Sequence, residues 1–112
     1  MFNPFRKSRH TELSASALSA MLAEGSALVV DVREADEFAA GHIPGALSMP
    51  LSAFQPSRLP AAAGKTIVLN CAAGRRSAMA LDKCAAARPD IDTHLAGGVG
   101  AWRAAGLPLA QG

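Results

Sequence analysis

Two short apolar runs, each followed by a stretch that favours a helix, constrain the fold of this chain more than any other feature. Residues 27–32 read ALVVDV and residues 65–70 read KTIVLN. Such mainly apolar runs are typical of strands that are buried on both faces. Strands of that kind alternate with helices in parallel sheets, because parallel neighbours need a crossover connection. The sequence therefore predicts an α/β domain built on a parallel sheet.

Helix signals lie between and around these runs. Ser14 can cap a helix, and Gly25 is placed to end it. Between them, Leu18, Met21 and Leu22 share one helix face. The remaining predicted elements are helices over residues 34–40, 77–87 and 99–105, strands over residues 46–49 and 93–95, and a mostly irregular loop over the proline-containing residues 50–64.

Composition argues against several classes of function. The 112 residues carry a formal charge of +2, and only 4% are aromatic, so a nucleic-acid surface of basic and stacking side chains is not expected. No apolar run approaches the ~18 residues of a membrane span, and no secretory signal is recognisable near the N-terminus. The two cysteines form no C-x-x-C pair and the three histidines are dispersed, so neither a disulfide framework, a metal site nor a cofactor is predicted. The expected location is the reducing cytoplasm, with no nucleic-acid or membrane partner.

Cys71 directly follows the second apolar run, at the carboxyl end of the predicted strand. Open parallel sheets bind their ligands at this edge. Gly74 allows the following loop to curl, so that successive backbone N–H groups can point inward. A helix that starts near Ser77 adds the positive end of its dipole. Residues 71–77 are therefore a candidate anion cradle that favours the thiolate of Cys71.

Three short motifs follow one another along the chain. The first is D-V-R-E at residues 31–34, followed by E-F and by G-H-I-P-G-A at residues 41–46. The second is C-A-A-G-R-R-S at residues 71–77, and the third is L-A-G-G at residues 95–98 with A-W and A-G-L-P behind it. In this order and at these separations they resemble the signatures of the single-domain rhodaneses, a family of thiosulfate sulfurtransferase-like proteins whose active-site loop reads C-x-x-G-x-R-[ST].

The resemblance covers residues 11–109 as a single rhodanese domain, which leaves a flexible N-terminal arm at residues 1–10 and a tail at residues 110–112. It implies a small parallel sheet flanked by helices on both faces. It also implies that Cys71 is catalytic and carries sulfur as a persulfide. The loop residues that would form the cradle around it are Ala72, Ala73, Gly74, Arg75, Arg76 and Ser77.

Several residues of the motifs have two interpretations. Arg76 either contacts the substrate or holds the shape of the loop, and Arg75 has no fixed counterpart in the family. Ser77 either caps the helix or donates a hydrogen bond to the sulfur. The resemblance implies that the ionisable residues of the first motif, Asp31, Arg33, Glu37 and His42, are mainly structural support. In it, Asp31 and Arg33 tie loops together near the strand ends.

Other conspicuous residues are interpreted as structural. Cys84 shares a helix face with apolar neighbours, so a small core residue is favoured over a resolving thiol. Trp102 is expected in the core. The pair Gly97 and Gly98 is expected to form a tight turn, since it lacks the third glycine of a nucleotide-binding fingerprint.

Two other functions use the same features. A phosphatase or arsenate reductase also holds an oxyanion in a cysteine, amide and arginine cradle. However, four residues separate Cys71 from Arg76, where cysteine phosphatases have five, and Asn70 replaces the histidine that commonly precedes the phosphatase cysteine. A non-catalytic rhodanese-like binding module is the second alternative, against which the retained Cys71, Gly74 and Arg76 argue. The expected partners are a small anionic sulfur donor, thiosulfate or a persulfide that a protein could also supply, and a thiophilic acceptor.

Overall fold

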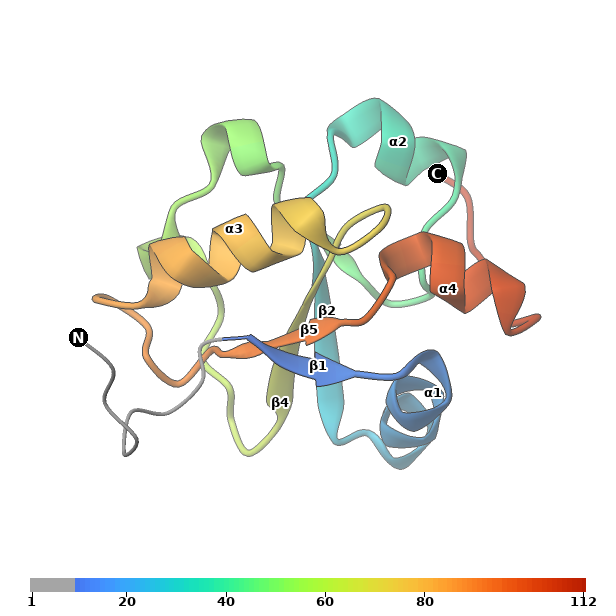
Figure 1. The fold of residues 1–112 in the computed structure, drawn as a ribbon, viewed down its shortest axis with the longest axis horizontal. Helices are drawn as coiled ribbons and strands as arrows, with labels where there is room; N and C mark the ends of the chain where they lie inside the picture. The colour runs from blue at the N-terminus through green and yellow to red at the C-terminus, as the bar shows by residue number, and fades with distance from the viewer. Residues whose placement is uncertain (1–9) are drawn as a thin grey trace.

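The computed structural model describes residues 10–112, which form a five-stranded sheet with helices around it (Figure 1). All strand pairs of the sheet are parallel, in the order β1-β5-β4-β2-β3. The strands are β1 (Thr11–Leu13), β2 (Ala27–Asp31), β3 (Leu47–Ser48), β4 (Thr66–Asn70) and β5 (Thr93–Leu95). The helices are α1 (Ala15–Glu24), α2 (Ala35–Ala40), α3 (Arg75–Cys84) and α4 (Gly98–Ala104). The prediction of an α/β domain on a parallel sheet is confirmed.

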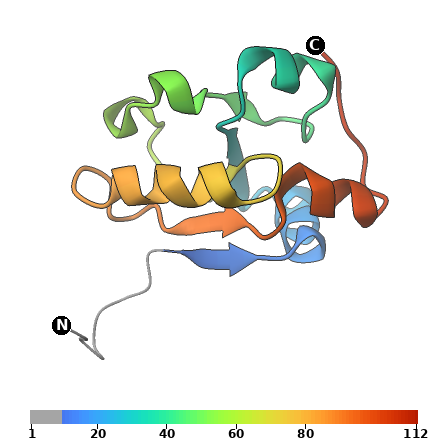
Figure 2. The same ribbon diagram turned by 45° about the horizontal axis from the view of Figure 1, so that its top comes forward.

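Helices cover both faces of the sheet (Figures 1 and 2). Alternate residues of β2 point to opposite faces, so Val30 contributes to the apolar cluster under α3 and Val29 to the cluster under α1 and α4. The central strand β4 divides in the same way, with Leu69 in the first cluster and Val68 in the second. Trp102 of α4 is 2% exposed in the second cluster, where the sequence places it. The two clusters fix both sides of the strand that ends at the candidate site.

The predicted ends of α1 are confirmed. The hydroxyl oxygen of Ser14 accepts a hydrogen bond from the N–H of Ala17 at 3.1 Å, and Gly25 ends the helix with a φ of 73°. By contrast, α3 begins two residues before the predicted range and ends at Cys84 rather than at residue 87. Its last turn tightens, because the N–H of Ala85 donates to the carbonyl of Asp82 three residues earlier.

Strand β1 has no counterpart among the predicted strands. Thr11 and Glu12 are exposed, so no apolar run marks this edge of the sheet. Backbone pairing holds the strand instead, with Thr11 opposite Thr93 and Leu13 opposite Leu95 of β5. A short edge strand of this kind depends on its neighbour, which a local sequence pattern does not reveal.

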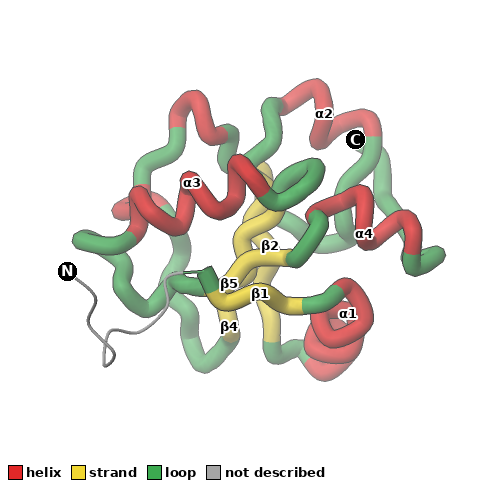
Figure 3. The backbone as a smooth tube through the Cα atoms, viewed as in Figure 1, coloured by secondary structure: helices red, strands yellow, loops and turns green. Residues whose placement is uncertain are grey.

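The predicted arm at residues 1–10 lies outside the described residues except for His10, whose Nε2 is 2.8 Å from a carboxylate oxygen of Asp82. The connection between β3 and β4, predicted as mostly irregular, carries the two short 3-10 turns η1 (Leu51–Ala53) and η2 (Pro56–Arg58) (Figure 3). Within residues 10–112, every helix is too short or too polar to cross a lipid bilayer.

The last residues of the chain return to the carboxyl edge of the sheet. The backbone groups of His42 and Ala110 exchange two hydrogen bonds, at 2.9 and 2.8 Å. The N–H of Gly112 donates to the carbonyl of Ala39 in α2 at 3.0 Å. The tail at residues 110–112 is therefore attached to α2 and to the turn that follows it.

Candidate active site

The thiol of Cys71 lies at the carboxyl edge of the sheet, immediately after the central strand β4. The residue is 1% exposed. Its Sγ accepts hydrogen bonds from the backbone N–H of Gly74 at 3.1 Å and of Ser77 at 3.3 Å, and it lies 3.5 Å from the hydroxyl oxygen of Ser77. The loop thus turns its donors towards the sulfur.

Gly74 makes this curl possible. Its φ of 107° lies in a region that side chains disfavour, and it is the N-cap residue of α3. Of the two roles considered for Ser77, capping does not occur, because α3 already begins at Arg75 and Ser77 lies within its first turn. There the N–H of Ser77 has no acceptor inside the helix and donates to Cys71 instead.

Opposing effects act on the pKa of Cys71. Burial raises the pKa of the thiol, whereas hydrogen bonds from the Ser77 hydroxyl and from the N–H groups of Ser77, Ala73 and Gly74 lower it. The hydrogen bonds prevail, so the pKa lies below that of an ordinary cysteine. A lowered pKa increases the share of nucleophilic thiolate near neutral pH.

Helix α4 supports the loop from the other side. The N–H of Val99 donates to the carbonyl of Cys71 at 2.9 Å, and the N–H of Gly100 donates to the carbonyl of Ala72 at 3.0 Å. Gly98 comes so close that a Cβ there would lie 2.3 Å from the Cys71 carbonyl oxygen. The prediction of a tight turn missed this contact, because two segments far apart in the sequence meet here.

Asp31 and Arg33 form a buried ion pair at the same edge of the sheet. The Nε of Arg33 lies 3.1 Å from both carboxylate oxygens of Asp31, and its Nη2 donates to the Gly41 carbonyl at 2.7 Å. The pair thereby ties the end of β2 to the end of α2. His42 follows, with Nδ1 2.9 Å from the carbonyl oxygen of Phe38 and its ring stacked on that of Phe38 at 3.8 Å.

Arg76 binds a glutamate of α2. Its two terminal nitrogens donate to the two carboxylate oxygens of Glu37 at 2.7 and 3.0 Å. Hydrogen bonding by Arg76 is the main reason why the pKa of Glu37 falls from 4.5 to about 2, although burial of the carboxylate acts to raise this pKa. Of the two roles considered for Arg76, holding the loop in shape is the one that these contacts support. The other loop residues are more open, with Ala72 half-buried and Ala73 and Arg75 exposed.

His94 belongs to this site although no sequence motif marks it. It lies in β5, next to β4, and is 5% exposed. Its Nδ1 is 2.7 Å from the hydroxyl oxygen of Ser77, which itself lies 3.1 Å from the carbonyl oxygen of Gly74. Burial lowers the pKa of His94. The sequence alone does not point to His94, because its place at the site follows from β5 lying beside β4 and from α3 crossing above both strands.

A comparison with models of protein families matches residues 14–105 to the rhodanese-like domain. This chain is a member of the rhodanese-like family. The match includes Cys71 and the whole loop that follows it, so the recognition from three motifs is confirmed.

Relatives of this rhodanese domain have diverse names. An uncharacterized protein of Synechocystis is 43% identical over 99 residues, which are 88% of this chain and 55% of that protein. The chain spans about half, or less, of the length of the curated relatives that it matches. Among solved structures, the thiosulfate sulfurtransferase of Pseudomonas aeruginosa is similar with a TM-score of 0.79 and 27% identity, over 92% of this chain and 20% of that one. A Rhodopseudomonas palustris protein of unknown function, named as a possible tyrosine phosphatase, is similar with a TM-score of 0.74 and 25% identity, over 98% and 99% of the two chains.

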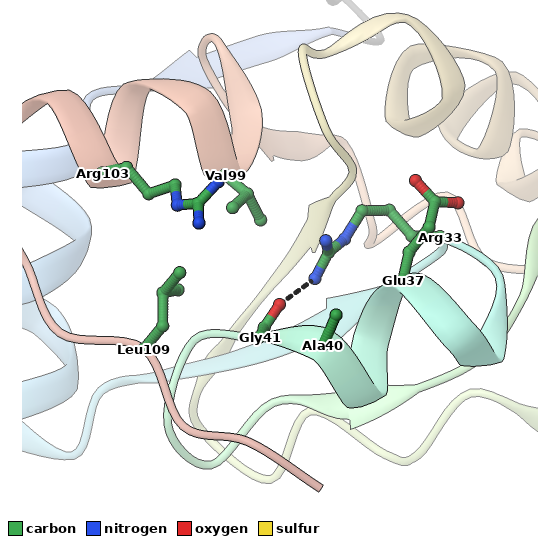
Figure 4. Close-up of a pocket in the computed structure, with 7 residues that line it drawn as sticks. All are labelled: Arg33, Glu37, Ala40, Gly41, Val99, Arg103 and Leu109. Atoms are coloured by element: carbon green, nitrogen blue, oxygen red, sulfur yellow. Dashed lines mark hydrogen bonds between the residues drawn. The ribbon is translucent and has the colours of Figure 1, made fainter.

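A cavity of about 80 Å³ lies at the same edge of the rhodanese domain, between α2, α4 and the C-terminal segment (Figure 4). Cys71 does not line it. Two of its lining residues contact the loop: the N–H of Val99 donates to the Cys71 carbonyl, and the Glu37 carboxylate binds Arg76. Its lining residues are Arg33, Glu37, Ala40, Gly41, Val99, Arg103 and Leu109.

What the rhodanese loop offers chemically is a buried sulfur nucleophile within a set of N–H donors. Both cysteines of the chain are free thiols. In residues 10–112, no group of three or more histidine, cysteine, aspartate or glutamate side chains is arranged to hold a metal ion. The site is therefore described by Cys71, its loop and the contacts that hold the loop in shape.

Proposed function

We propose that this rhodanese domain is a sulfurtransferase that carries sulfur on Cys71 as a persulfide. The observation that carries the proposal is the buried Sγ that accepts hydrogen bonds from Gly74 and Ser77 at 3.1 and 3.3 Å. Such donors stabilise a thiolate, and they would equally stabilise the charge of a persulfide one bond further out. The similarity to a thiosulfate sulfurtransferase supports this reaction.

The reaction proceeds in two steps. The Cys71 thiolate attacks the outer sulfur of thiosulfate or of a persulfide donor; a new S–S bond forms, and the S–S bond of the donor breaks. Its electron pair leaves with sulfite or with the donor thiolate. Cyanide or an acceptor thiolate then attacks the outer sulfur of the Cys71 persulfide, and Cys71 departs as thiolate without any cofactor. Covalent transfer of this kind gives ping-pong kinetics.

The charge at the loop fits a small anionic donor. Arg75 is exposed beside the cradle, and the chain carries a net charge of +2. Such charges raise the encounter rate with anions like thiosulfate. A protein persulfide would present the same sulfur to Cys71 and is the alternative donor. Because the reaction needs a reduced Cys71, a reducing compartment such as the cytoplasm suits it.

Phosphate-ester hydrolysis is the second candidate, because one structural neighbour is a possible tyrosine phosphatase. Two features favour sulfur. The four residues between Cys71 and Arg76 make a shorter ring of amides, which suits a sulfur atom better than a tetrahedral oxyanion. In addition, Glu37 engages both terminal nitrogens of Arg76, so this guanidinium is not free to bind a phosphate.

Mass spectrometry of the protein and of its peptides after exposure to thiosulfate tests the proposal. Wild-type protein should gain the mass of one sulfur atom on the peptide that contains Cys71, and cyanide should remove it as thiocyanate. Cys71→Ser should gain no sulfur, whereas the matched control Cys84→Ser should behave like wild type. Failure to take up sulfur from both thiosulfate and a small persulfide would overturn the proposal in favour of a binding module. Faster hydrolysis of aryl phosphates than sulfur transfer would favour a phosphatase.

A further inference from the structure

The hydroxyl of Ser77 joins the nucleophile to a buried histidine. The Sγ of Cys71 lies 3.5 Å from the Ser77 oxygen, and that oxygen lies 2.7 Å from Nδ1 of His94. The three residues are 1%, 0% and 5% exposed, so bulk water has little access to this path. The proposed steps of sulfur transfer do not involve a histidine. His94 nevertheless lies at the end of a hydrogen-bonded path from the thiol.

The directions of these hydrogen bonds fit the passage of a proton. The thiol of Cys71 donates to the Ser77 oxygen. The Ser77 hydroxyl can donate onward to a neutral His94 whose Nδ1 carries no proton. Burial lowers the pKa of His94 and so favours this neutral ring. The other acceptor near the hydroxyl, the Gly74 carbonyl at 3.1 Å, is the more distant one.

We propose, on the basis of the sulfurtransferase function above, that His94 takes up the proton of the Cys71 thiol through the hydroxyl of Ser77. The S–H bond of Cys71 breaks as an O–H bond forms at Ser77, and the original hydroxyl proton moves to Nδ1 of His94. The product is a thiolate and an imidazolium, and no oxidant or reductant is consumed. His94 acts through Ser77 and does not touch the substrate, so it is a positioning residue that sets how much thiolate is present.

Charged groups on the neighbouring elements tune the charge of His94. Glu12 of β1 is its partner in the parallel register, and the Glu12 charge favours the imidazolium. His10, whose ring centre is 6.0 Å from that of His94, opposes it when protonated. His10 in turn pairs with Asp82 of α3 at 2.8 Å. The negative charge of the Cys71 thiolate also favours the imidazolium of His94, because opposite charges stabilise each other.

Alkylation of Cys71 by iodoacetamide, followed from about pH 5 to about pH 9 by mass spectrometry of its peptide, tests this path. His94→Asn keeps a polar partner for the Ser77 hydroxyl, but an amide side chain cannot take up the proton of the thiol. Alkylation of Cys71 at about pH 6 should therefore slow about tenfold. Ser77→Ala removes the connection and should slow it at least as much. In the double variant, His94→Asn should add nothing to Ser77→Ala, because both changes break the same path.

His42→Asn is the matched control, since it removes a buried histidine whose Nδ1 contacts Phe38 and not the loop. Its alkylation profile should follow that of wild type. A profile of His94→Asn that coincides with wild type would overturn the proposal. Should His94→Asn not fold, the titration of the His94 ring in wild-type protein, followed by nuclear magnetic resonance, decides instead: its pKa should fall once Cys71 is alkylated, and an unchanged titration overturns the proposal.

The two proposals fail separately. Alkylation needs no sulfur donor, so it reports on His94 even if the protein takes up no sulfur from thiosulfate. Conversely, sulfur uptake by wild-type protein together with an unchanged alkylation profile in His94→Asn would refute the proton path alone.

Discussion

The two cysteines stand at opposite ends of α3 and differ in what surrounds their sulfur. Cys71 precedes the helix, whereas Cys84 is its last residue. Both are buried, and both contribute to the same apolar cluster. At Cys71 the N–H groups of the loop and of the first turn point at Sγ, while Cys84 lies at the carboxyl end of the helix, where the dipole is negative. Two equally buried thiols therefore differ in their electrostatic surroundings, because they lie at opposite ends of one helix.

The largest expected effect on turnover comes from replacing each cysteine in turn by serine. Cys71→Ser should lower thiosulfate:cyanide turnover at least about a thousandfold, because a hydroxyl cannot replace the thiolate nucleophile. Cys84→Ser should keep most of the turnover, although a hydroxyl in the apolar cluster lowers the free energy of unfolding by about 1–3 kcal/mol. Steady-state kinetics and urea unfolding measure both. An inactive Cys84→Ser variant would contradict the assignment of Cys71, at the amino end of α3, as the nucleophile.

Lengthening the chain at either end of α3 gives the next largest effect. One glycine inserted between Ala73 and Gly74 moves the N–H donors away from Sγ, and loss of one such donor costs about 10²–10³ in turnover. One glycine inserted between Ala86 and Ala87, which are exposed beyond the other end, should leave turnover within about threefold of wild type. We also expect no useful hydrolysis of aryl phosphates by wild-type protein, and only weak inhibition by vanadate. Full sulfur transfer by the first insertion variant would show that loop length does not select the substrate.

The support that α4 gives to the loop can be tested with a pair of glycines. Gly98→Ala places a Cβ 2.3 Å from the Cys71 carbonyl oxygen, so it should lower the free energy of unfolding by about 3 kcal/mol and reduce turnover. Gly106→Ala meets a similar backbone penalty, with a φ of 73°, but open space. It should cost only about 1 kcal/mol and leave turnover unchanged. Equal losses in the two variants would mean that the backbone conformation, and not the close approach, matters at Gly98.

The smallest effect concerns the arginines that clamp the two ends of α3. Because the pKa of Glu37 is about 2 in the folded protein and 4.5 ordinarily, its pair with Arg76 stabilises the fold above about pH 4.5, and the contribution is lost as the pH falls to about 2. Both side chains are one-third exposed, so Glu37→Gln should cost only about 0.5 kcal/mol near neutral pH. It should also flatten the pH dependence of urea unfolding in that window.

Asp90→Asn is the counterpart at the other end, where Arg88 lowers the pKa of Asp90 through a hydrogen bond. It should cost a similar amount of stability while Cys71 alkylation stays as in wild type. A larger change in alkylation for Asp90→Asn than for Glu37→Gln would contradict the view that the first turn of α3, and not its last, shapes the loop.

Much of the fold was predictable because its signals are local. The apolar runs at β2 and β4 need only their own residues to be recognised as buried strands, and Ser14 and Gly25 mark the ends of α1 by their own chemistry. The loop from Cys71 is likewise a contiguous motif. These are the features for which the sequence analysis and the structure agree.

The features that could not be predicted arise from contacts between distant segments. Gly98 is required where α4 meets the Cys71 carbonyl, and His94 gains its meaning from a serine on another element. The choice between the two roles of Ser77 stayed open because the conformation of Gly74 starts the helix earlier than composition indicates. The contacts of Gly98 and His94 depend on the order of strands in the sheet, which no single segment encodes, whereas the start of α3 depends on the backbone conformation of one glycine.

The paired hydrogen bonds between His42 and Ala110 offer a way to observe the motion of the active-site edge. Since each backbone N–H bonds to the carbonyl of the other residue, both amides become exposed to solvent when the last residues separate from the turn after α2. The two amides should therefore show the same protection against hydrogen exchange, set by one opening event. Because α2 also carries Glu37, that protection would report how often the C-terminal segment separates from the helix that holds Arg76.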